Sequence, residues 1–307
     1  MGTGDFAVPA LSKLLDSEHE VIGVVTQPDR ESGRGRKVKM ASIKQLALDD
    51  GIPVFQPEKV RSPEFIELVR EMAPDLSVVA SYGQIIPQAL LDIPTLGNIN
   101  IHGSLLPKYR GAAPIHYALF NGDAVTGVTT MLMEAGIDTG PMLLKCEVAI
   151  DPNDDRASLE VKLSEAGADL LMETIGLLDR RQLTPIPQDD ALATYAPSIN
   201  RDACLIDWNM DACHVAGRIR GCSPKPGAFT HWQGATLKLL MCSPVDDVST
   251  GGIPGEIVSV GRDGIIVRTG EGSILITEVQ PGNRNRMSAS EFARGYNVQP
   301  GMRFARE

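Results

Sequence analysis

Long apolar runs are missing from this chain. Its apolar stretches, such as Leu76–Ala80 and Ile274–Ile276, are far too short to cross a bilayer, which takes about 20 residues. The first residues, from Met1 to Phe6, have no basic flank and no long apolar stretch, so they do not predict a signal peptide. A globular protein outside the membrane is therefore expected.

Cysteine is scarce as well. An odd number without a C-x-x-C pair argues against a disulfide framework and against a zinc site. The five cysteines are scattered between residues 146 and 242: Cys146, Cys204, Cys213, Cys222 and Cys242. Their pattern suits a reducing compartment, so a cytoplasmic protein that binds no metal is expected.

Positive charge is also in deficit, but it is unevenly distributed. The net charge of −10 argues against broad, non-specific binding of nucleic acid. A local basic segment nevertheless spans residues 30–44, with Glu31 as its one acid, and consists of Arg30, Arg34, Arg36, Lys37, Lys39 and Lys44. A sparser second cluster contains Arg284, Arg286, Arg294, Arg303 and Arg306. The basic segment indicates a mobile cationic arm, although a solvated surface loop is the alternative.

Helical and strand patterns alternate over the first 150 residues. Such alternation predicts an α/β domain with a Rossmann-like, mainly parallel sheet. Helices are expected at 10–17, 41–49, 63–71 and 156–181, and strands at 21–26, 54–56, 76–81 and 97–102. Two further strands, at 127–133 and 142–150, follow each other with only a loop between them and predict an antiparallel edge.

The composition changes near residue 183. Prolines and polar residues without periodicity predict a linker over 183–201, between a catalytic domain at 1–182 and a second domain at 202–307. One helix at 211–221 and five short, glycine-punctuated strands between 227 and 279 predict a small β-barrel, resembling an oligonucleotide-binding fold. The chain opens on what looks like the first glycine-rich turn, Gly2-Thr-Gly-Asp. The first strand of the catalytic domain is therefore expected to be missing, which raises the question of stability.

The candidate chemistry lies at the end of the expected strand 97–102. Ile99 and Ile101 alternate with Asn100 and His102, so one face of the strand is apolar and the other polar. A polar row on a strand buried on both sides is costly unless it lines a cavity or is hydrogen-bonded. In open α/β sheets, ligands bind at the carboxyl ends of the strands. A binding crevice is expected there, and Asp138, between two glycines after another strand, is a second candidate.

Two motifs in this region carry a resemblance. The segment His102-Gly-Ser-Leu-Leu-Pro-Lys-Tyr-Arg-Gly, followed by Asp138-Thr-Gly, is similar to the signature of the folate-dependent formyltransferases. Phe6-Ala-Val-Pro, Thr26-Gln-Pro-Asp-Arg, Gly33-Arg-Gly-Arg-Lys, Tyr82-Gly-Gln-Ile-Ile-Pro, Ile206-Asp-Trp and Ser223-Pro-Lys-Pro-Gly-Ala-Phe extend it over nearly the whole chain. Within that superfamily, the chain most resembles the methionyl-tRNA formyltransferase family.

The resemblance implies a catalytic triad at Asn100, His102 and Asp138. Asn100 and His102 would donate hydrogen bonds to the developing oxyanion, while Asp138 would orient the imidazole and help move a proton. Three alternatives remain open from the residues alone: a structural histidine, an asparagine that caps a turn, and an ordinary turn aspartate.

The resemblance also implies two binding regions. The co-substrate 10-formyltetrahydrofolate would lie against Ser104, Leu105, Leu106 and Pro107 and against Tyr82, Gly83 and Ile85. Arg34, Arg36 and Lys37 would contact tRNA. The implied reaction is formylation of the α-amino group of methionyl initiator tRNA by a monomeric enzyme that uses no metal.

Other functions stay open at this point. A folate-dependent formyltransferase could act on a sugar nucleotide, on glycinamide ribonucleotide or on water. A nucleic-acid-binding module without catalysis is a further alternative. A nicotinamide dehydrogenase is the least favoured, because Gly2-x-Gly4-x-x-Ala7 follows no strand in this sequence.

Overall fold

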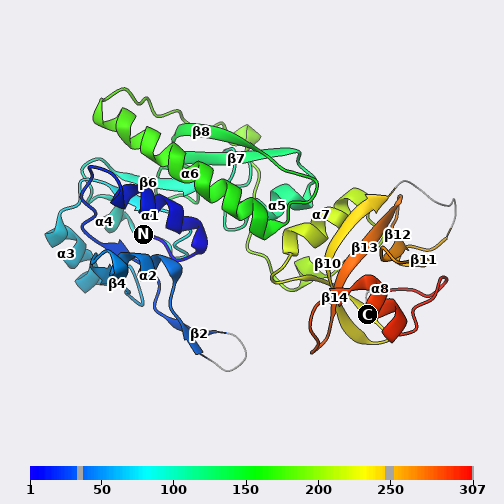
Figure 1. Cartoon of the computed structure of the whole chain (residues 1–307). Coiled ribbons are helices and arrows are strands. Elements are labelled where there is room, and N and C mark those ends of the chain that lie inside the picture. The colour runs from blue at the N-terminus through cyan, green and yellow to red at the C-terminus, as the bar shows by residue number, and fades with distance from the viewer. Residues whose placement is uncertain (33–36, 246–251, 306–307) are drawn as a thin grey trace. The chain divides into compact units, whose positions relative to one another are not determined.

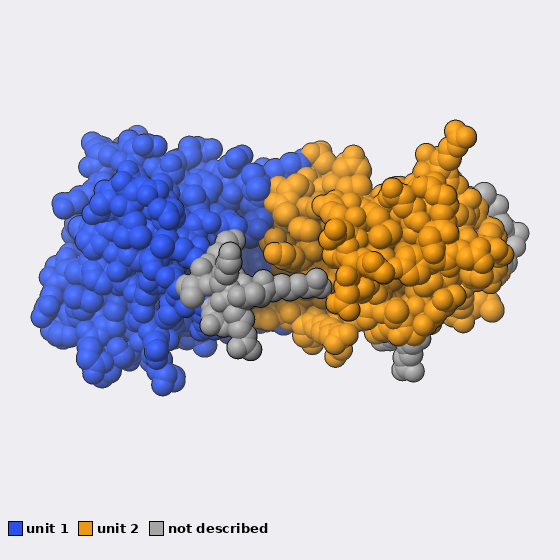
Figure 2. Space-filling model, turned by 60° about the horizontal axis from the view of Figure 1, so that its bottom comes forward, with its two compact units in different colours: residues 1–114, 125–149, 160–197 blue, residues 115–124, 150–159, 198–307 orange. Residues whose placement is uncertain are grey.

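The computed structural model describes residues 1–32, 37–245 and 252–305, and the chain divides into two units (Figure 2). The first unit contains residues 1–114, 125–149 and 160–197, and the second contains 115–124, 150–159 and 198–307. The segment 183–197 thus groups with the first unit. The expected domain boundaries at 182 and 202 stay a prediction.

A mixed sheet forms the centre of the first unit (Figure 1). β1 (Val24–Val25) pairs in parallel with β4 (Val54–Phe55). β5 (Ser77–Val79) and β6 (Asn98–His102) are also parallel, whereas β7 (Val125–Leu132) and β8 (Met142–Ala149) continue the order β5-β6-β7-β8 as antiparallel neighbours. The predicted Rossmann-like sheet with an antiparallel edge is confirmed.

Helices flank this sheet, and their ends follow from local sequence. They are α1 (Val8–Leu15), α2 (Ser42–Asp49), α3 (Pro63–Met72), α4 (Gln88–Leu91) and α6 (Arg156–Asp179), whereas nearly all of α5 (Pro114–Phe120) belongs to the second unit. α3 begins after Ser62, whose side chain accepts a hydrogen bond from the Phe65 amide at 3.3 Å, with proline at the first helical position.

The longest helix, α6, lies against β6 and β7. A Cβ atom at Gly167 would come within 2.8 Å of Ile101 and 3.3 Å of Val128, so glycine lets the helix approach these strands closely. α6 has 24 residues, but no helix in the described part of the chain is long and apolar enough to cross a membrane.

Residues 1–3 occupy the position between β1 and β5. The Gly2 amide donates to the carbonyl of Val25 at 2.9 Å, and the Ala80 amide donates to the carbonyl of Met1 at 3.0 Å. Gly2 and Ala80 form a parallel bridge. These hydrogen bonds join the β1–β4 pair to the four-stranded part. Because they are few, the hydrogen bonding between strands is sparsest at this position.

The second unit is an antiparallel sheet that curves toward closure. β9 (Ala228–Trp232), β10 (Ala235–Val245), β11 (Ile257–Val260), β12 (Ile265–Arg268) and β13 (Ser273–Pro281) have the order β11-β12-β13-β10-β9, and β14 (Met287–Ser288) pairs with β13. Isolated bridges join His231 to Ala305 and Glu256 to Arg303, so one segment touches both edge regions. The predicted C-terminal β-sheet domain is confirmed.

Besides α5, this unit contains α7 (Ala212–Cys222) and α8 (Ala289–Gly295). α7 matches the predicted helix, whereas α8 was not expected. The signal for α8 was a capping box, in which Ser288 accepts from the amide of Glu291 while the Glu291 carboxylate accepts from the amide of Ser288.

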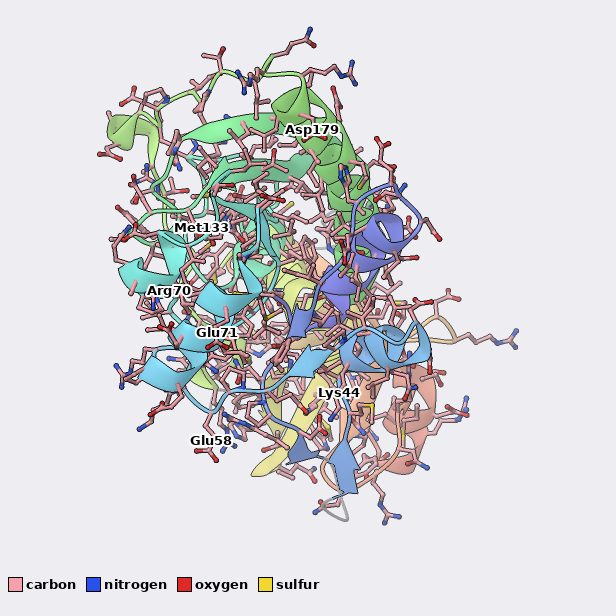
Figure 3. The ribbon with its side chains drawn as sticks, turned by 90° about the vertical axis from the view of Figure 1, so that its left-hand side faces the viewer. Lys44, Glu58, Arg70, Glu71, Met133 and Asp179 are labelled. Carbon is pink, nitrogen blue, oxygen red and sulfur yellow. The ribbon has the colours of Figure 1, made fainter. Side chains whose placement is uncertain are left out.

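A short hairpin carries the basic segment. β2 (Arg30–Ser32) and β3 (Lys37–Lys39) are antiparallel partners. Arg34 and Arg36 lie outside the described residues, and only the backbone of Lys37 is described. Lys44 lies beyond the hairpin on α2 (Figure 3), where its ammonium pairs with Asp29 and donates to Gln56 at 2.7 Å.

Candidate active site

The strand β6 presents polar side chains toward its carboxyl end. Ile99 and Ile101 on its apolar face are almost fully buried. On the polar face, the side chain of Asn98 has a structural partner: its amide donates a hydrogen bond to the Leu91 carbonyl at 2.7 Å. Asn100 and His102 come next along this face, so the alternation in the sequence correctly indicates which side chains line the site.

Asp138 meets both of these residues. The Asn100 amide donates to Oδ1 of Asp138 at 3.3 Å. The Nδ1 atom of His102 lies 3.6 Å from Oδ2 of the same carboxylate, too far for a hydrogen bond but close for an ion pair. The His102 side chain is 6% exposed and that of Asp138 17% exposed, so the carboxylate is the more accessible group. The structure therefore brings the three predicted residues together.

The backbone around Asp138 is unusual. Asp138 has φ +52°, in the left-handed region, and its Oδ2 accepts from the Gly111 amide at 2.8 Å. Gly111 has φ +118°, and a Cβ atom there would lie 2.8 Å from the Ala196 carbonyl oxygen. A Cβ at Gly140 would lie 1.9 Å from the Leu132 carbonyl oxygen. Both glycines are required for the loop to bring the carboxylate to β6.

The second nitrogen of His102 faces a backbone carbonyl. Nε2 lies 2.9 Å from the Tyr109 oxygen. A carbonyl oxygen can only accept, so Nε2 carries a hydrogen in this arrangement. The ring orientation is thereby fixed, and Nδ1 is the atom turned toward Asp138.

Gln188 and Arg110 fix the loop that carries Asp138 through hydrogen bonds. The sequence did not identify either of them as a site residue. The Gln188 amide donates to the carbonyls of Asp138 and Gly140, each at 2.8 Å. Its oxygen accepts from Nε of the buried Arg110 at 3.0 Å. Gln188 lies in the non-periodic segment predicted as a linker, which offered no pattern that could identify it. Arg110 is part of the recognised motif, but a motif match does not say what a residue contacts.

The 104–107 loop is fixed by β7 and β8. Thr129 of β7 accepts from the Leu106 amide at 3.1 Å and donates to the Ser104 carbonyl at 2.7 Å. Its cross-strand neighbour Lys145 donates to the Leu106 carbonyl, and burial lowers the pKa of this lysine. Neither residue was predicted, because a threonine and a lysine within a strand give no functional signal.

The predicted folate-lining residues differ in accessibility. Ser104, Leu106 and Tyr82 are buried, and Leu105 and Pro107 are half-buried, whereas Gly83 and Ile85 are exposed. The Tyr82 hydroxyl is buried without a hydrogen-bond partner among the described residues, and burial raises its pKa to about 12. Such a hydroxyl costs about 1–3 kcal/mol and suits a polar ligand atom or a water molecule.

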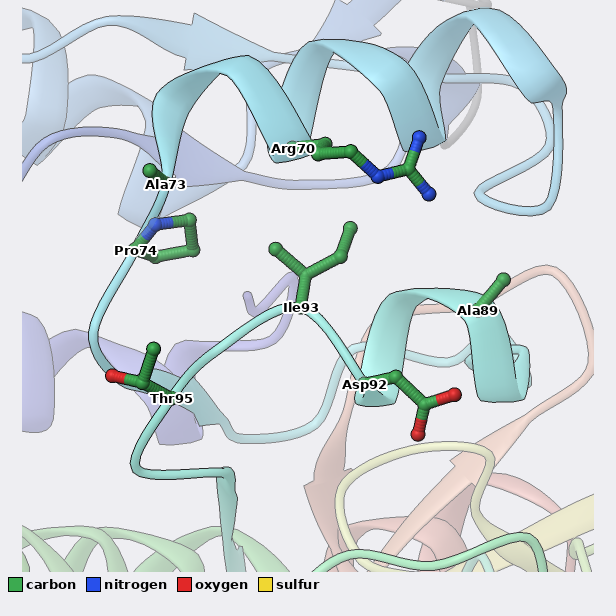
Figure 4. Close-up of a pocket in the computed structure, with 7 residues that line it drawn as sticks. All are labelled: Arg70, Ala73, Pro74, Ala89, Asp92, Ile93 and Thr95. Atoms are coloured by element: carbon green, nitrogen blue, oxygen red, sulfur yellow. The ribbon is translucent and has the colours of Figure 1, made fainter.

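The hollow shown in Figure 4 is a different place. It has a volume of about 490 Å³, and it is lined by residues of α3, α4 and the turns that follow them, with Ile93 pointing into it. None of the residues of the candidate triad lines it. The described part of the chain also has no group of three or more histidine, cysteine or acidic side chains that could hold a metal ion.

These groups suit acyl transfer to an amine. The Asn100 amide has a second N–H for an oxyanion, since one hydrogen bonds to Asp138. The carboxylate of Asp138 and the ring of His102 can hold or pass a proton. A covalent nucleophile and a metal ion are not required for such a reaction.

Comparisons with known proteins identify the family. The Formyl transferase family model matches residues 1–175, and the model for the Formyl transferase C-terminal domain matches residues 198–297. A methionyl-tRNA formyltransferase of Geobacter sulfurreducens is 49% identical over 303 residues, which cover 99% of this chain and 95% of the relative. One of Acetivibrio thermocellus is 45% identical over 301 residues, covering 98% and 97%.

A solved structure shows the same fold. The N-formyltransferase of Helicobacter canadensis, in complex with folinic acid and dTDP-3-aminofucose, has a TM-score of 0.67 at 17% identity and matches 91% of this chain and 97% of its own. At that identity, the likeness concerns the fold alone. The sequence relatives are far closer and span both units, and the chain therefore belongs to the formyl transferase family, among the methionyl-tRNA formyltransferases.

Proposed function

We propose that this chain transfers the formyl group of 10-formyltetrahydrofolate to the α-amino group of methionyl initiator tRNA. The observation that carries this proposal is the identity of 49% to a methionyl-tRNA formyltransferase over 99% of the chain. The acceptor follows from relatives whose likeness includes the C-terminal domain, a part that the chemistry itself does not need.

Asn100 is proposed to stabilise the transition state. Attack of a neutral amine on the formyl carbon places negative charge on the formyl oxygen. The free N–H of Asn100 is directed by the hydrogen bond that its other hydrogen makes to Asp138. A fixed donor of this kind contributes about 10²–10³ in rate.

Asp138 and His102 are proposed to handle the proton. As the C–N bond forms and the bond from the formyl carbon to the folate nitrogen breaks, one proton leaves the amine and one reaches that nitrogen. The Asp138 carboxylate is the more accessible partner, and Nδ1 of His102 faces it at 3.6 Å. Free α-amines titrate near 7.7–8.0, so part of the acceptor is neutral without further help.

The folate is proposed to bind along the 104–107 loop and the 82–85 turn. Thr129 and Lys145 hold three backbone groups of the loop, so its shape is set before the substrate arrives. Exposed Ile85 and half-buried Leu105 offer apolar contact, and the unpartnered Tyr82 hydroxyl offers a polar one.

The tRNA is proposed to contact the basic hairpin and the C-terminal β-domain. Glycines alternate with Arg34, Arg36 and Lys37 in the sequence, and a hairpin with many cations suits a phosphate backbone. Lys44 is already paired with Asp29, so it belongs to the base of the hairpin rather than to its contact surface.

The acceptor can be tested directly. Labelled formyl transfer from 10-formyltetrahydrofolate would be compared for charged initiator tRNA, charged elongator tRNA, an amino-sugar nucleotide and glycinamide ribonucleotide. The proposal expects transfer to initiator methionyl-tRNA alone at a substantial rate. Transfer to a small amine with none to the tRNA, from a chain shown to be folded, would replace the tRNA assignment.

A further inference from the structure

The segment 186–196 lies along the loops that carry the candidate site, although the sequence predicted it as part of a linker. All of it belongs to the first unit. Near its start, Gln188 donates to the Asp138 carbonyl at 2.8 Å. Near its end, Tyr195 forms a parallel bridge with Arg110, in the loop that follows β6. One short segment therefore contacts both loops from which the site is built.

Backbone hydrogen bonds fasten the end of this segment to the loop after β6. The Arg110 amide donates to the Thr194 carbonyl at 2.8 Å, and the Ala196 amide donates to the Arg110 carbonyl at 2.8 Å. The Thr194 amide donates to the carbonyl of Pro107 at 3.3 Å, within the loop proposed to bind the folate. These bonds do not involve the side chain of Thr194, so they remain when that side chain is changed.

The side chain of Thr194 makes a separate contact that leads to His102. Its Oγ1 accepts from the Tyr109 amide at 2.9 Å. Tyr109 has φ +61°, in the left-handed region that a residue with a side chain seldom adopts. The carbonyl of the same residue accepts from Nε2 of His102 at 2.9 Å. A single residue in an uncommon conformation thus connects the threonine hydroxyl with the imidazole.

This connection bears on which ring nitrogen of His102 carries the hydrogen. In a neutral imidazole, the hydrogen bond made by one nitrogen decides the state of the other. With the Tyr109 carbonyl in place, the hydrogen is on Nε2, and the lone pair of Nδ1 faces Oδ2 of Asp138 at 3.6 Å. If the carbonyl moves away, the Nδ1–H form gains, because it can donate to the carboxylate. Only the Nε2–H form leaves Nδ1 able to take up a proton.

We propose that Thr194 is a positioning residue that holds His102 in the Nε2–H form through the Tyr109 carbonyl. Together with Gln188, which holds the backbone of Asp138, it makes the 186–196 segment set the geometry of both groups proposed to move the proton. The role in catalysis rests on the proposed function. The effect on the imidazole does not, because it requires no substrate.

The state of the imidazole can be measured without any reaction. Nitrogen-15 NMR of labelled histidine would be recorded for the parent chain, Thr194→Val and Thr194→Ser, with the His102 signals assigned through His102→Gln. Valine keeps the shape of threonine but cannot accept a hydrogen bond, whereas serine keeps the hydroxyl. The ratio of Nδ1–H to Nε2–H is expected to rise about fivefold in the valine variant and to stay at the parent value in the serine variant. The same ratio in all three proteins would overturn the proposal.

Steady-state formyl transfer then separates positioning from stability. In Thr194→Val, kcat is expected to fall about fivefold, while KM for 10-formyltetrahydrofolate stays nearly unchanged because the backbone bond to Pro107 remains. Thr194→Ser should restore kcat. The control is Thr184→Val, at an exposed threonine two residues before the segment, and it should transfer at the parent rate.

The two measurements fail in different ways. A lower Tm for Thr194→Val with the parent imidazole state and the parent kcat would show that the hydroxyl serves only stability, and this would overturn the proposal. A parent chain that transfers formyl to no acceptor would contradict the proposed function instead. The NMR ratio would still decide in that case whether Thr194 governs the state of His102.

Discussion

The two parts of the first unit's sheet differ in what fixes them. Around β6, polar side chains and loop backbones satisfy one another, as in the contacts of Asp138 with Asn100 and Gly111. Between β1 and β5, apolar side chains and a few charged ones line a cavity of about 510 Å³, and a few backbone hydrogen bonds of residues 1–3 join the two sides. The proposed chemistry lies in the part around β6.

The geometry of the candidate site and the packing between β1 and β5 are therefore separable. The triad residues lie on β6 and on the loop between β7 and β8, whereas the larger cavity is lined by residues around β1 and β5. A change in the larger cavity between β1 and β5 should therefore act on stability, whereas a change in the hydrogen bonds that fix the Asp138 loop should act on rate.

The largest effect is expected for Asp138→Asn. The substitution keeps the size of the side chain, but it removes the negative charge that faces His102 and leaves one acceptor oxygen where the carboxylate has two, for Asn100 and for Gly111. The rate of formyl transfer should fall by about 10²–10³ while Tm changes little. Asp92→Asn, at an exposed carboxylate in the hollow of Figure 4, is the matched control and should transfer at the parent rate. Parent-like transfer by Asp138→Asn would remove this residue from the mechanism.

The sequence alone could predict the three residues proposed for catalysis, but not the residues whose hydrogen bonds position them. The alternation of Asn98, Asn100 and His102 with isoleucines shows which face of β6 is polar, because the strand period is two. Gln188 could not be found that way, since its contacts depend on where a non-periodic segment returns to the sheet.

The length of β1 could not be predicted from the sequence either. The strand expected at 21–26 is reduced to Val24–Val25, although the apolar run is longer. Residues 20–23 line the larger cavity between β1 and β5, where no neighbouring strand completes their hydrogen bonding. Periodicity predicts where a strand can form, but the partner decides how far it extends.

A smaller effect is expected for Gln188→Ala. Losing the donor to the Asp138 and Gly140 carbonyls and the acceptor for Arg110 should loosen the loop and lower kcat about tenfold, with KM for folate nearly unchanged. Gln188→Glu keeps the acceptor for Arg110 but lacks the N–H donors, so it should not restore kcat.

Steady-state kinetics beside Gln182→Ala, an exposed control, would check the role of Gln188. A lower Tm with kcat unchanged would show that Gln188 serves only stability.

The smallest effect concerns pH and the buried amine of Met1. Its pKa is about 5 in the folded chain and near 8.0 when unfolded, so the unfolded state binds the proton first as pH falls. The resulting stability is fully present above pH 8 and is lost toward pH 5, by on the order of 1 kcal/mol per pH unit. Urea unfolding at several pH values would measure this slope.

Acetylation of the amine provides the control for that slope. His19, Glu20, Asp75 and Asp179 also line the larger cavity and are present in both forms, so the difference between the acetylated and free chains isolates the amine. Equal slopes would show that the amine reaches water in the folded state.

The central claim is that the polar end of β6 performs formyl transfer, and Asn100 tests it most directly. Single-turnover transfer from 10-formyltetrahydrofolate to methionyl initiator tRNA would be measured for the parent chain and for Asn100→Ala, with circular dichroism to verify folding. The account predicts transfer by the parent and a loss of about 10²–10³ in the variant. A folded Asn100→Ala chain that transfers formyl at the parent rate would contradict it.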